Sequence, residues 1–506
     1  MDDVLGKIVN LQDLTRISHE QKKRKKKIVL CHGVFDVVHP GHLEYFRIAR
    51  EHGDTLLVSV TADRYVNKGP NRPLFSQEKR MHFLASLQII DYVVLSDSPS
   101  SESVIRSLRP DVYAKGEEYR NLETDKTGKI QVEKKAVEEC GGSIIFTGGF
   151  TSSSTKIINT LSSQHNPVLL NWRKTLRDKF TIDEIIMWLN KVEKRQPIVT
   201  GETIVDRYTW CRPLSKSSKD PLLAFEIVES MNFPGGILLI ADHCSQLSSN
   251  TTLLTARNES DLFVIEQLEQ LSKNCTVKSL VDKDIATIIK HRFLDRGTKS
   301  KLFETYVFDP RNFTEEIYLE MQEIISNVGD SIIIADYGHG FFSEDFIKKL
   351  SETEKFIALN VQTNAGNRGF NHISKYPRAD FISLNGGELE LQFRSRDLDY
   401  YEVVPDIMQK MGARRAILTL GENGLLVFDV DGSVHSTPAL TSRVVDKVGA
   451  GDAVFASAAL LASVDTPIEI IGLVSGVCAA HEVQSLGHHK SLTITDLERH
   501  VRSILL

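Results

Sequence analysis

The stretch that decides the fold of the first half of the chain is residues 28–50, IVLCHGVFDVVHPGHLEYFRIAR. It opens with an apolar run, residues 28–31, that predicts a buried strand, and it closes with an amphipathic run, residues 42–50, that predicts a helix. Glycines and histidines lie between the two. In an open α/β sheet this is the carboxyl end of a strand, where ligands bind. The stretch therefore predicts a strand–turn–helix unit with a binding site in its turn.

The same alternation continues to about residue 162. Short strands that alternate with helices form parallel βαβ units. We therefore expect an open, Rossmann-like α/β domain over residues 27–162, with an N-terminal extension at residues 1–26. The further strands are predicted at residues 55–60, 92–95, 112–114 and 143–146, and the helices at 77–87, 101–108 and 132–139.

A second domain is predicted beyond a polar, proline-containing boundary at residues 162–167, SSQHNP. The charged residues 172–194 have a helical period, so we expect a helical linker over residues 163–195. A second α/β domain is then expected over residues 196–506. Its predicted strands lie at residues 197–200, 332–336, 356–360, 381–384 and 416–420.

Composition narrows the class of protein. The chain has 506 residues, a formal net charge of -6 and no apolar run of about 18 residues, so no membrane-spanning helix is expected. Net acidity argues against a general nucleic-acid binder. The basic run at residues 22–27 is interpreted as a solvated segment, with a nucleic-acid or lipid patch as the alternative.

Cysteine usage and the N-terminus predict the compartment. The six cysteines form no C-x-x-C pair, which is typical of reduced thiols rather than of a zinc site. Residues 1–10 lack the basic and apolar regions of a secretory signal. We expect a cytoplasmic protein.

The turn after the first strand carries the first chemical constellation. His39 and His42 flank Pro-Gly at the start of the predicted helix. Helix N–H groups and two imidazoles would converge there on a polyphosphate, and Gly33 and Gly41 would let it approach the backbone. A pair of metal ligands or a purely structural turn are the alternatives.

These residues, with Phe35 and Asp36, resemble the signature of the HxGH cytidylyltransferase-like nucleotidyltransferases. The resemblance runs over residues 28–160 and implies nucleotidyl transfer, in which a sugar phosphate oxygen attacks the α-phosphorus of a nucleoside triphosphate. It implies that His39 and His42 are catalytic residues. It also implies that the nucleotide is bound by Gly33, Phe35, Asp36 and Gly41. It also implies phosphate contacts by Lys68, Arg80, Lys115, Ser152, Ser153, Ser154 and Thr155.

The second constellation lies near the C-terminus. Gly449-Ala450-Gly451-Asp452 precedes an apolar run of small residues that predicts a helix. The glycines would free backbone N–H groups for an anion hole at the helix start. Asp452 could take a proton from a substrate hydroxyl. A glycine turn with an aspartate N-cap is the structural alternative.

This pattern resembles the ribokinase (PfkB) family of carbohydrate kinases over about 300 residues, and the chain has no Walker A motif. The resemblance implies sugar contacts by Asp206, Gly235 and Gly236, and Mg²⁺ binding through Asn385 and Glu388. It also implies that the nucleotide and its phosphates are bound by Thr419, Gly421, Gly424, Gly449, Ala450 and Gly451.

The chain also departs from this family at the sugar end. Glu202 stands where aspartate is common, and Asn360-Val361-Gln362 replaces a frequent Asp-Pro-Lys. The usual alanine and asparagine after the Gly235-Gly236 pair are missing. A different sugar and a loss of kinase activity are both compatible with these departures.

Together the two halves resemble bifunctional ADP-heptose synthases, with the domains in the opposite order. The resemblance implies a heptose-type kinase and a sugar-1-phosphate nucleotidyltransferase that make an ADP- or CDP-linked sugar for surface polysaccharide. It implies Mg²⁺, with ATP and possibly CTP as co-substrates. The expected partners are a sugar phosphate and a nucleoside triphosphate, with a possible homodimer. The alternative is an active transferase joined to a degenerate kinase-like binding or regulatory domain.

Overall fold

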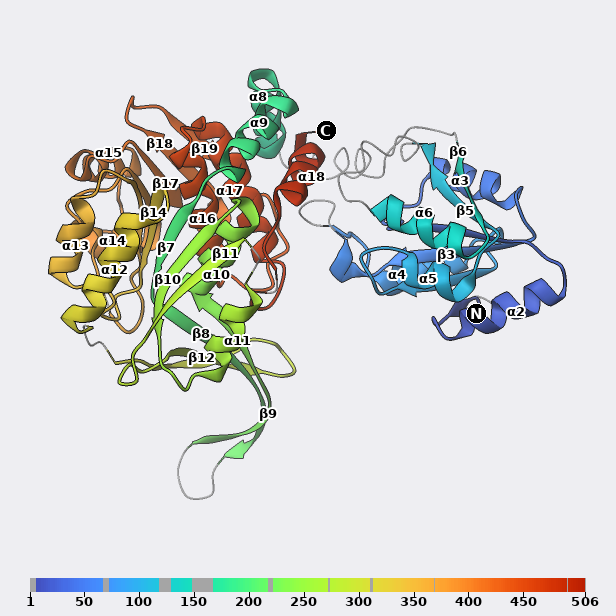
Figure 1. Cartoon of the computed structure of the whole chain (residues 1–506), viewed down its shortest axis with the longest axis horizontal. Coiled ribbons are helices and arrows are strands. Elements are labelled where there is room, and N and C mark those ends of the chain that lie inside the picture. Colours follow the sequence, from blue (N-terminus) through green and yellow to red (C-terminus); the bar gives the residue numbers. More distant parts are fainter. Residues whose placement is uncertain are drawn as a thin grey trace. The chain divides into compact units, whose positions relative to one another are not determined.

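The computed structural model describes residues 6–66, 72–117, 129–147, 167–216, 222–271, 274–309, 313–367, 369–488 and 490–505. Its contacts divide the chain into two compact units, residues 1–170 with 502–506 and residues 171–501 (Figure 1). The predicted α/β class is confirmed in both units. No helix in the described part of the chain is long and apolar enough to cross a membrane.

The first unit is built on a six-stranded parallel sheet. Five of its strands match predicted ones, and the apolar runs of the central strands are buried on both faces. The strand order is β1 (Ile8–Val9), β4 (Tyr92–Ser96), β3 (Thr55–Thr61), β2 (Ile28–Gly33), β5 (Val112–Gly116) and β6 (Ser143–Thr147).

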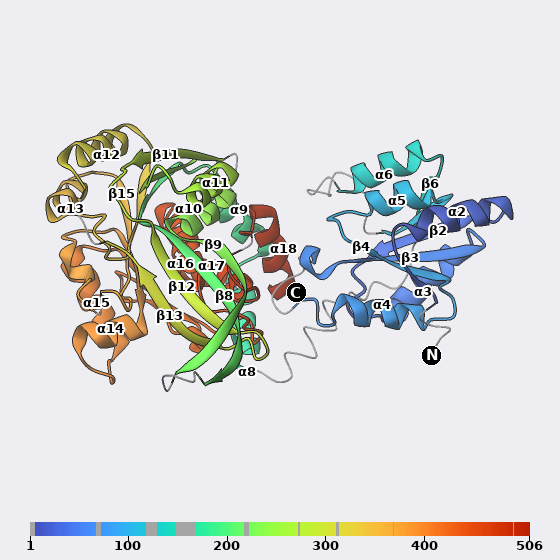
Figure 2. The same ribbon diagram turned by 90° about the horizontal axis from the view of Figure 1, so that it is seen from below.

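Helices cover both faces of this sheet (Figure 2). Helices α3 (Pro40–Arg50) and α4 (Gln77–Ala85) pack on the face that contains Val29 and Val58. The opposite face, with Leu30 and Leu57, carries three helices. These are α2 (Asp13–Lys23), α5 (Glu102–Leu108) and α6 (Lys129–Glu139).

The predicted N-terminal extension is part of this unit where it is described. Ile8 and Val9 pair with β4, and Leu14 and Ile17 of α2 are buried. The basic run begins in the last turn of α2, where lysines favourably face the helix C-terminus. Residues 6–23 therefore complete the fold of the first unit.

The second unit contains a nine-stranded sheet that is parallel from β11 to β17 and antiparallel at β18 and β19. The five predicted strands are confirmed as β7, β14, β15, β16 and β17. The order is β11 (Cys275–Val281), β10 (Thr251–Arg257), β7 (Pro197–Gly201), β14 (Ser331–Asp336), β15 (Phe356–Val361), β16 (Phe381–Asn385), β17 (Arg415–Thr419), β18 (Leu425–Asp429) and β19 (Val434–Thr437).

Two helical layers enclose this sheet (Figures 1 and 2). One layer packs an apolar core against the sheet and consists of α12 (Glu315–Asn327), α13 (Glu344–Ser351), α14 (Gly386–Phe393) and α15 (Tyr400–Met411). The other contains α9 (Ile182–Glu193), α10 (Ile237–Leu247), α16 (Ala450–Ser463) and α17 (Ile468–Glu482). Helices α8 (Pro167–Lys179), α11 (Leu262–Gln270) and α18 (Ile494–Leu505) complete the set among the described residues.

The predicted helical linker is two helices, α8 and α9. Thr181 caps α9 by accepting a hydrogen bond from the Glu184 backbone N–H at 3.2 Å. Trp172 of α8 is buried and its indole N–H donates to His435 at 3.2 Å. From residue 171 onward this segment therefore packs on the second unit.

A separate four-stranded sheet was not predicted from the sequence. Its order is β13 (Lys301–Val307), β12 (Ile288–Asp295), β8 (Thr203–Lys216) and β9 (Leu223–Gly236). Strands β8 and β12 are parallel neighbours, and their register sets Asp206 beside Lys290. This register brings charged side chains of the small sheet to one place.

Two candidate active sites

The predicted turn of the first unit forms the N-terminus of α3. The ring of His39 caps the helix through Nδ1, which accepts a hydrogen bond from the Gly41 N–H at 3.1 Å. His42 Nδ1 accepts from the His39 N–H at 3.4 Å, and the two ring centroids are 4.1 Å apart. Partial burial lowers the pKa of His39. Two imidazoles are thus held together at the positive end of a helix dipole.

Gly33 and Phe35 shape the entrance to this turn. Phe35 has a φ of 49°, which is uncommon for a residue with a Cβ atom. Its ring meets His42 edge-to-face at 5.5 Å. A Cβ atom on Gly33 would lie 3.0 Å from the Phe35 ring, a tight contact, so glycine lets this ring pack closely against the strand end. The predicted residues Gly33, Phe35, His39, Gly41 and His42 therefore occupy one turn.

Asp36 has a different position from the predicted one on the nucleotide. Its carboxylate is buried and lies 2.8 Å from Arg72 Nε. It also accepts hydrogen bonds from the backbone N–H groups of Leu74 at 2.7 Å and Phe75 at 3.1 Å. The contacts of Asp36 therefore hold the segment after residue 72 against the turn.

Arg80 is likewise buried, with 2% of its surface exposed. Its guanidinium donates to the backbone carbonyls of Phe75 at 3.0 Å and Thr61 at 2.8 Å. It also contacts the Val34 carbonyl and the Asp63 carboxylate. These contacts account for the charge of Arg80 without a phosphate and give it a structural position.

Lys115 lies in a buried pair with Glu133, whose Oε2 is 2.9 Å from Nζ. Burial of Glu133 opposes ionisation, but the Lys115 charge lowers the pKa of this carboxyl to about 2. Glu133 also accepts a hydrogen bond from the Tyr113 hydroxyl at 3.0 Å. The remaining predicted phosphate contacts, Lys68 and Ser152, Ser153, Ser154 and Thr155, lie outside the described residues.

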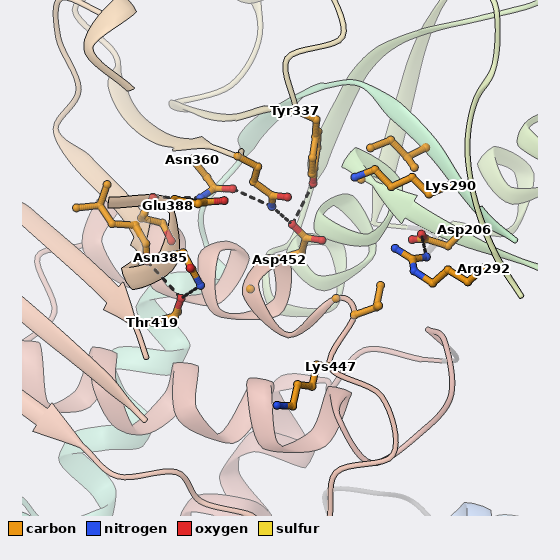
Figure 3. A pocket seen from close by; sticks show the side chains of 18 residues that line it. Asp206, Lys290, Arg292, Tyr337, Asn360, Asn385, Glu388, Thr419, Lys447 and Asp452 are labelled. Carbon is orange, nitrogen blue, oxygen red and sulfur yellow. Dashed lines mark hydrogen bonds and ion pairs between the residues drawn. The ribbon is translucent and has the colours of Figure 1, made fainter. Parts of the chain in front are cut away.

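The second candidate site is a cavity of about 250 Å³ in the second unit (Figure 3). The carboxyl ends of β14 to β17 form its floor, the start of α16 forms one wall, and strands β8 and β12 of the small sheet supply another. The predicted residues that line it are Asp206, Gly236, Asn385, Glu388, Thr419, Gly449, Gly451 and Asp452.

Asp452 is held at the centre of this cavity by two donors. The Tyr337 hydroxyl donates to Asp452 Oδ1 at 3.0 Å, and Gln362 Nε2 donates to the same oxygen at 2.8 Å (Figure 3). Burial raises the pKa of Asp452 to about 6, although both donors favour the charged form. A carboxylate of this kind can accept a proton near neutral pH.

Asn385, Glu388 and Thr419 form the opposite side of the cavity. Asn385 Nδ2 donates to Thr419 Oγ1 at 3.1 Å, and Glu388 Oε1 accepts from the Thr363 N–H at 3.1 Å. Burial raises the pKa of Glu388 to about 7. The side-chain oxygens suit a hard cation such as Mg²⁺, whose charge would favour the ionised form of Glu388.

Two cations reach the cavity from β12. Arg292 forms a buried ion pair with Asp206. Lys290 lies on the same strand, and its ammonium is 5.3 Å from the centre of the Tyr337 ring. Burial lowers the pKa of Lys290. Gly235 does not line the cavity, but a Cβ atom there would lie 2.3 Å from Asp206 Oδ2, so it makes room for this aspartate.

Glu202 lies beneath the cavity and positions the Tyr337 segment. Its carboxylate accepts hydrogen bonds from the backbone N–H groups of Tyr337 at 3.1 Å and His339 at 3.0 Å. Burial and the nearby Asp336 raise the pKa of Glu202 to about 7. The departure from aspartate at this position therefore serves local structure.

The predicted nucleotide loop lies only partly at the cavity. Thr419 lines it, whereas Gly421 and Gly424 do not. Gly424 has a φ of 85°, and a Cβ atom there would lie 2.1 Å from the Thr437 carbonyl oxygen. Gly424 therefore permits the turn between β17 and β18. Ala450, the first residue of α16, does not line the cavity either.

Sequence reasoning did not select Lys290, Arg292 or Lys447 for the cavity. Lys290 and Arg292 alternate along β12, a strand signal that could have been read at the sequence level. Tyr337 and Gln362 were not selected as site residues either, although Gln362 belongs to a segment that departs from the family pattern. Tyr337 and Gln362 contact Asp452 because of the order of the strands in the sheet, which the sequence alone does not show.

Comparison with known proteins agrees with both resemblances. The cytidylyltransferase-like family model matches residues 30–160, and the pfkB family carbohydrate kinase model matches residues 342–494. The chain thus carries an N-terminal cytidylyltransferase-like region and a C-terminal PfkB region.

The curated relatives include the bifunctional protein HldE of Geobacter metallireducens, 38% identical over 161 residues, which are 31% of each chain. The bifunctional protein HldE of Campylobacter fetus subsp. fetus is 36% identical over 157 residues, again 31% of each chain. The chain thus matches about a third of the length of these relatives.

Among solved structures, phosphofructokinase-2 from Escherichia coli in complex with potassium is 14% identical. It aligns with a TM-score of 0.51 over 62% of this chain and 99% of that one. This likeness establishes the fold of the second unit.

Proposed function

We propose that the chain joins a sugar kinase to a sugar-1-phosphate nucleotidyltransferase and makes an ADP- or CDP-linked sugar of heptose type for surface polysaccharide. One observation carries the kinase half. The cavity gathers Asp452, the glycine turn at the start of α16, and the oxygen ligands Asn385 and Glu388. A general base, an anion-binding helix start and a cation site are the parts that phosphoryl transfer requires.

In the kinase step, Asp452 accepts the proton of a sugar hydroxyl. The sugar oxygen then attacks the γ-phosphorus of ATP, and the bond to the bridging oxygen of ADP breaks. Gly449 and Gly451 line the cavity at the start of α16, where backbone N–H groups would stabilise the negative charge that develops on the phosphoryl group. Tyr337 and Gln362 orient the Asp452 carboxylate.

Mg²⁺ would be held by Asn385 and Glu388, directly or through water, and would neutralise charge on the ATP phosphates. The side chain of Thr419 fixes the amide of Asn385.

Lys290 and Arg292 support a phosphorylated sugar as the acceptor. Both cations line the cavity, where Arg292 pairs with Asp206 and lies 3.7 Å from Glu304 Oε2, so Lys290 is the cation of this wall proposed to meet an anionic group of the sugar. A neutral sugar has no group that would balance this charge, whereas a phosphate does. Gly235 and Gly236 keep this wall close to the cavity.

In the nucleotidyl step, an oxygen of a sugar 1-phosphate attacks the α-phosphorus of ATP or CTP and pyrophosphate leaves. His39 and His42 stand at the start of α3, where they and the helix N–H groups can stabilise the transferring phosphates. Lys68 and residues 152–155 are proposed as further phosphate contacts. Arg80 and Lys115 are proposed to support the site through their buried ion pairs.

Two assays on one preparation test the function. Pyrophosphate release is measured with heptose 1-phosphate and each of ATP, CTP, GTP and UTP. Phosphoryl transfer from ATP is measured on a panel of free and phosphorylated sugars. Release with one nucleotide and transfer to a sugar phosphate support the proposal. If neither reaction occurs with any substrate of the two panels, the proposed function is wrong.

A second candidate function keeps the transferase and makes the second unit a binding module. Gln362 favours it, because an amide donates to Asp452 where a lysine is frequent in the family that the unit resembles. The phosphoryl-transfer panel decides. Sugar binding by calorimetry without turnover at any ATP concentration would favour this candidate.

We also propose a cytoplasmic homodimer. The cytoplasm holds the nucleoside triphosphates that both reactions consume. The small sheet exposes a group of large apolar side chains, which is typical of a contact surface. They are Leu223, Ile227, Phe303 and Val307. Sedimentation of the chain and of Phe303→Lys tests the dimer, and a monomeric wild type would contradict it.

A further inference from the structure

A cluster of polar side chains lies buried behind the start of α16. Asp242 and His243 come from α10, Glu482 is the last residue of α17, and His488 follows it. The exposed fractions of His243, Glu482 and His488 are 2%, 4% and 9%. None of these residues has a part in the reactions proposed above.

The ligand atoms of this cluster have the spacing of a metal site. His488 Nδ1 lies 3.1 Å from Glu482 Oε1, and His243 Nε2 lies 3.6 Å from Glu482 Oε2. One ligand atom from each of the three residues lies within 4.8 Å of the others. Tetrahedral ligands at about 2.1 Å from a zinc ion are about 3.4 Å apart.

His243 supplies an independent observation. Its Nε2 is buried and makes no hydrogen bond, because the carboxylate oxygen that it faces, Glu482 Oε2, is 3.6 Å away. A buried polar atom that is left unpaired destabilises the fold, and it normally has a partner. A metal ion between His243 and Glu482 would satisfy this nitrogen.

Asp242 has the position of an outer-shell partner. Its Oδ2 lies 2.9 Å from His488 Nε2 and accepts a hydrogen bond from the Ser491 N–H at 3.2 Å. Histidines that bind a metal through one ring nitrogen usually donate the other N–H to a carboxylate or carbonyl. Asp242 would thus orient the His488 ring with Nδ1 toward the ion.

We propose that His243, Glu482 and His488 bind one divalent transition-metal ion, zinc by preference, with Asp242 as the outer-shell partner of His488. Two imidazoles and one carboxylate match the ligands of zinc, whereas Mg²⁺ prefers an all-oxygen set. This site shares no residue with the oxygen ligands Asn385 and Glu388 of the cavity.

The ion would support the turn that carries Asp452. Gly449, with a φ of 85°, stands directly against this cluster. A Cβ atom there would lie 2.8 Å from Leu239 Cδ2 of α10 and 3.0 Å from Glu482 Oε1 of α17. A metal that joins α10 to the end of α17 would therefore fix both surfaces on which the glycine turn rests.

The test is metal binding by the untagged full chain after treatment with a chelator. Co²⁺ is added first, because a four-coordinate cobalt ion has intense visible bands, and Zn²⁺ is then used to displace it. We expect one ion per chain with a four-coordinate spectrum. His243→Asn and His488→Asn should abolish this spectrum, and Asp242→Asn should weaken binding about 10–100-fold.

His500→Asn is the matched control, because His500 is buried on α18 at 3% exposure and lies outside the cluster. Circular dichroism checks that each variant folds. If His488→Asn does not fold, His243→Asn decides, since Nε2 of His243 makes no hydrogen bond that the substitution would break. Wild-type protein without the four-coordinate spectrum, or variants with an unchanged spectrum, would overturn the proposal and leave an ion-pair network around His488.

Discussion

The two candidate sites differ in how the chain builds them. The site in the first unit is one continuous turn, from Gly33 to His42, between a strand and a helix. The cavity in the second unit is assembled from strand ends, a helix start and a separate sheet. The histidine turn offers imidazoles, with the pKa of His39 lowered, whereas the cavity holds carboxyls whose pKa values are raised.

This difference follows from the nucleophiles of the two proposed reactions. A sugar phosphate is already an anion, so the first site needs only to position it and to neutralise charge on the triphosphate. A sugar hydroxyl must lose a proton, so the second site needs a base whose pKa lies near the working pH. The comparison predicts that substitutions in one site leave the other reaction unchanged.

The largest expected effect is that of Asp452→Asn on the kinase. Removal of the carboxylate that Tyr337 and Gln362 orient should lower kcat for phosphoryl transfer about 10²–10⁴-fold. Pyrophosphate release by the first unit should not change. Steady-state kinetics of both reactions on one preparation measure this.

Asp465→Asn, at the other end of the same helix and exposed, is the matched control and should keep both activities. Equal phosphoryl transfer by Asp452→Asn and the wild type would remove the proposed base from the mechanism.

His39→Ala should have the next largest effect, and on the other reaction. The His39 ring caps α3 and is proposed to contact the phosphates, so pyrophosphate release should fall about 10²–10³-fold while phosphoryl transfer is unchanged. His52→Ala, an exposed histidine just after α3, serves as the control. A loss of both activities would show instead that the substitution disturbs more than its own unit.

Lys290→Gln tests the charge of the sugar wall. Loss of this cation should raise KM for a sugar phosphate about tenfold and change KM for the free sugar much less, because a charged hydrogen bond is lost only with the former. The measurement belongs at pH 8, where Asp452 is ionised in both proteins. Lys278→Gln, exposed on β11, is the control. The same change in KM for both sugars would contradict a phosphate contact.

The fold could be predicted largely because its strands are short apolar runs, such as residues 55–61 and 331–336, that are buried wherever the sheet places them. The small sheet escaped prediction. Strand β9 is exposed along much of its length. Residues 203–209 of β8 are mostly buried, but they mix charged and polar residues with apolar ones, so the sequence shows no apolar run there. Strand β1 has only two residues, which is too short for a periodic signal.

The site residues also fall into two classes, those that the sequence predicts and those that it does not. His39, His42, Gly449 and Asp452 stand in contiguous motifs, so their neighbours in space are also neighbours in sequence. Lys290 reaches Asp206 only through the register of β12 with β8, which is set by pairing between distant segments. Arg80 has the charge of a phosphate ligand, but backbone carbonyls around it decide its position. No local pattern carries such information.

The smallest expected effect is a shift in the pH profile of the kinase. With an Asp452 pKa of about 6, log kcat/KM should fall with unit slope below that pH, since only the ionised carboxyl accepts a proton. The Tyr337 hydroxyl donates to the ionised form and so lowers this pKa. Tyr337→Phe removes that donor, and the acid limb should therefore move upward.

A hydrogen bond to a charged group is worth about 1.5–3 kcal/mol, and one pKa unit corresponds to about 1.36 kcal/mol, so the limb should move by no more than about 1–2 pH units. Tyr376→Phe is the control, because its hydroxyl donates to Asp336, outside the cavity, at 2.7 Å. It should destabilise the fold and leave the limb in place. If the Tyr337→Phe profile falls in amplitude but keeps its midpoint, the acid limb reports a group other than Asp452. Glu388 would then be the group to substitute next, because burial also raises its pKa, to about 7.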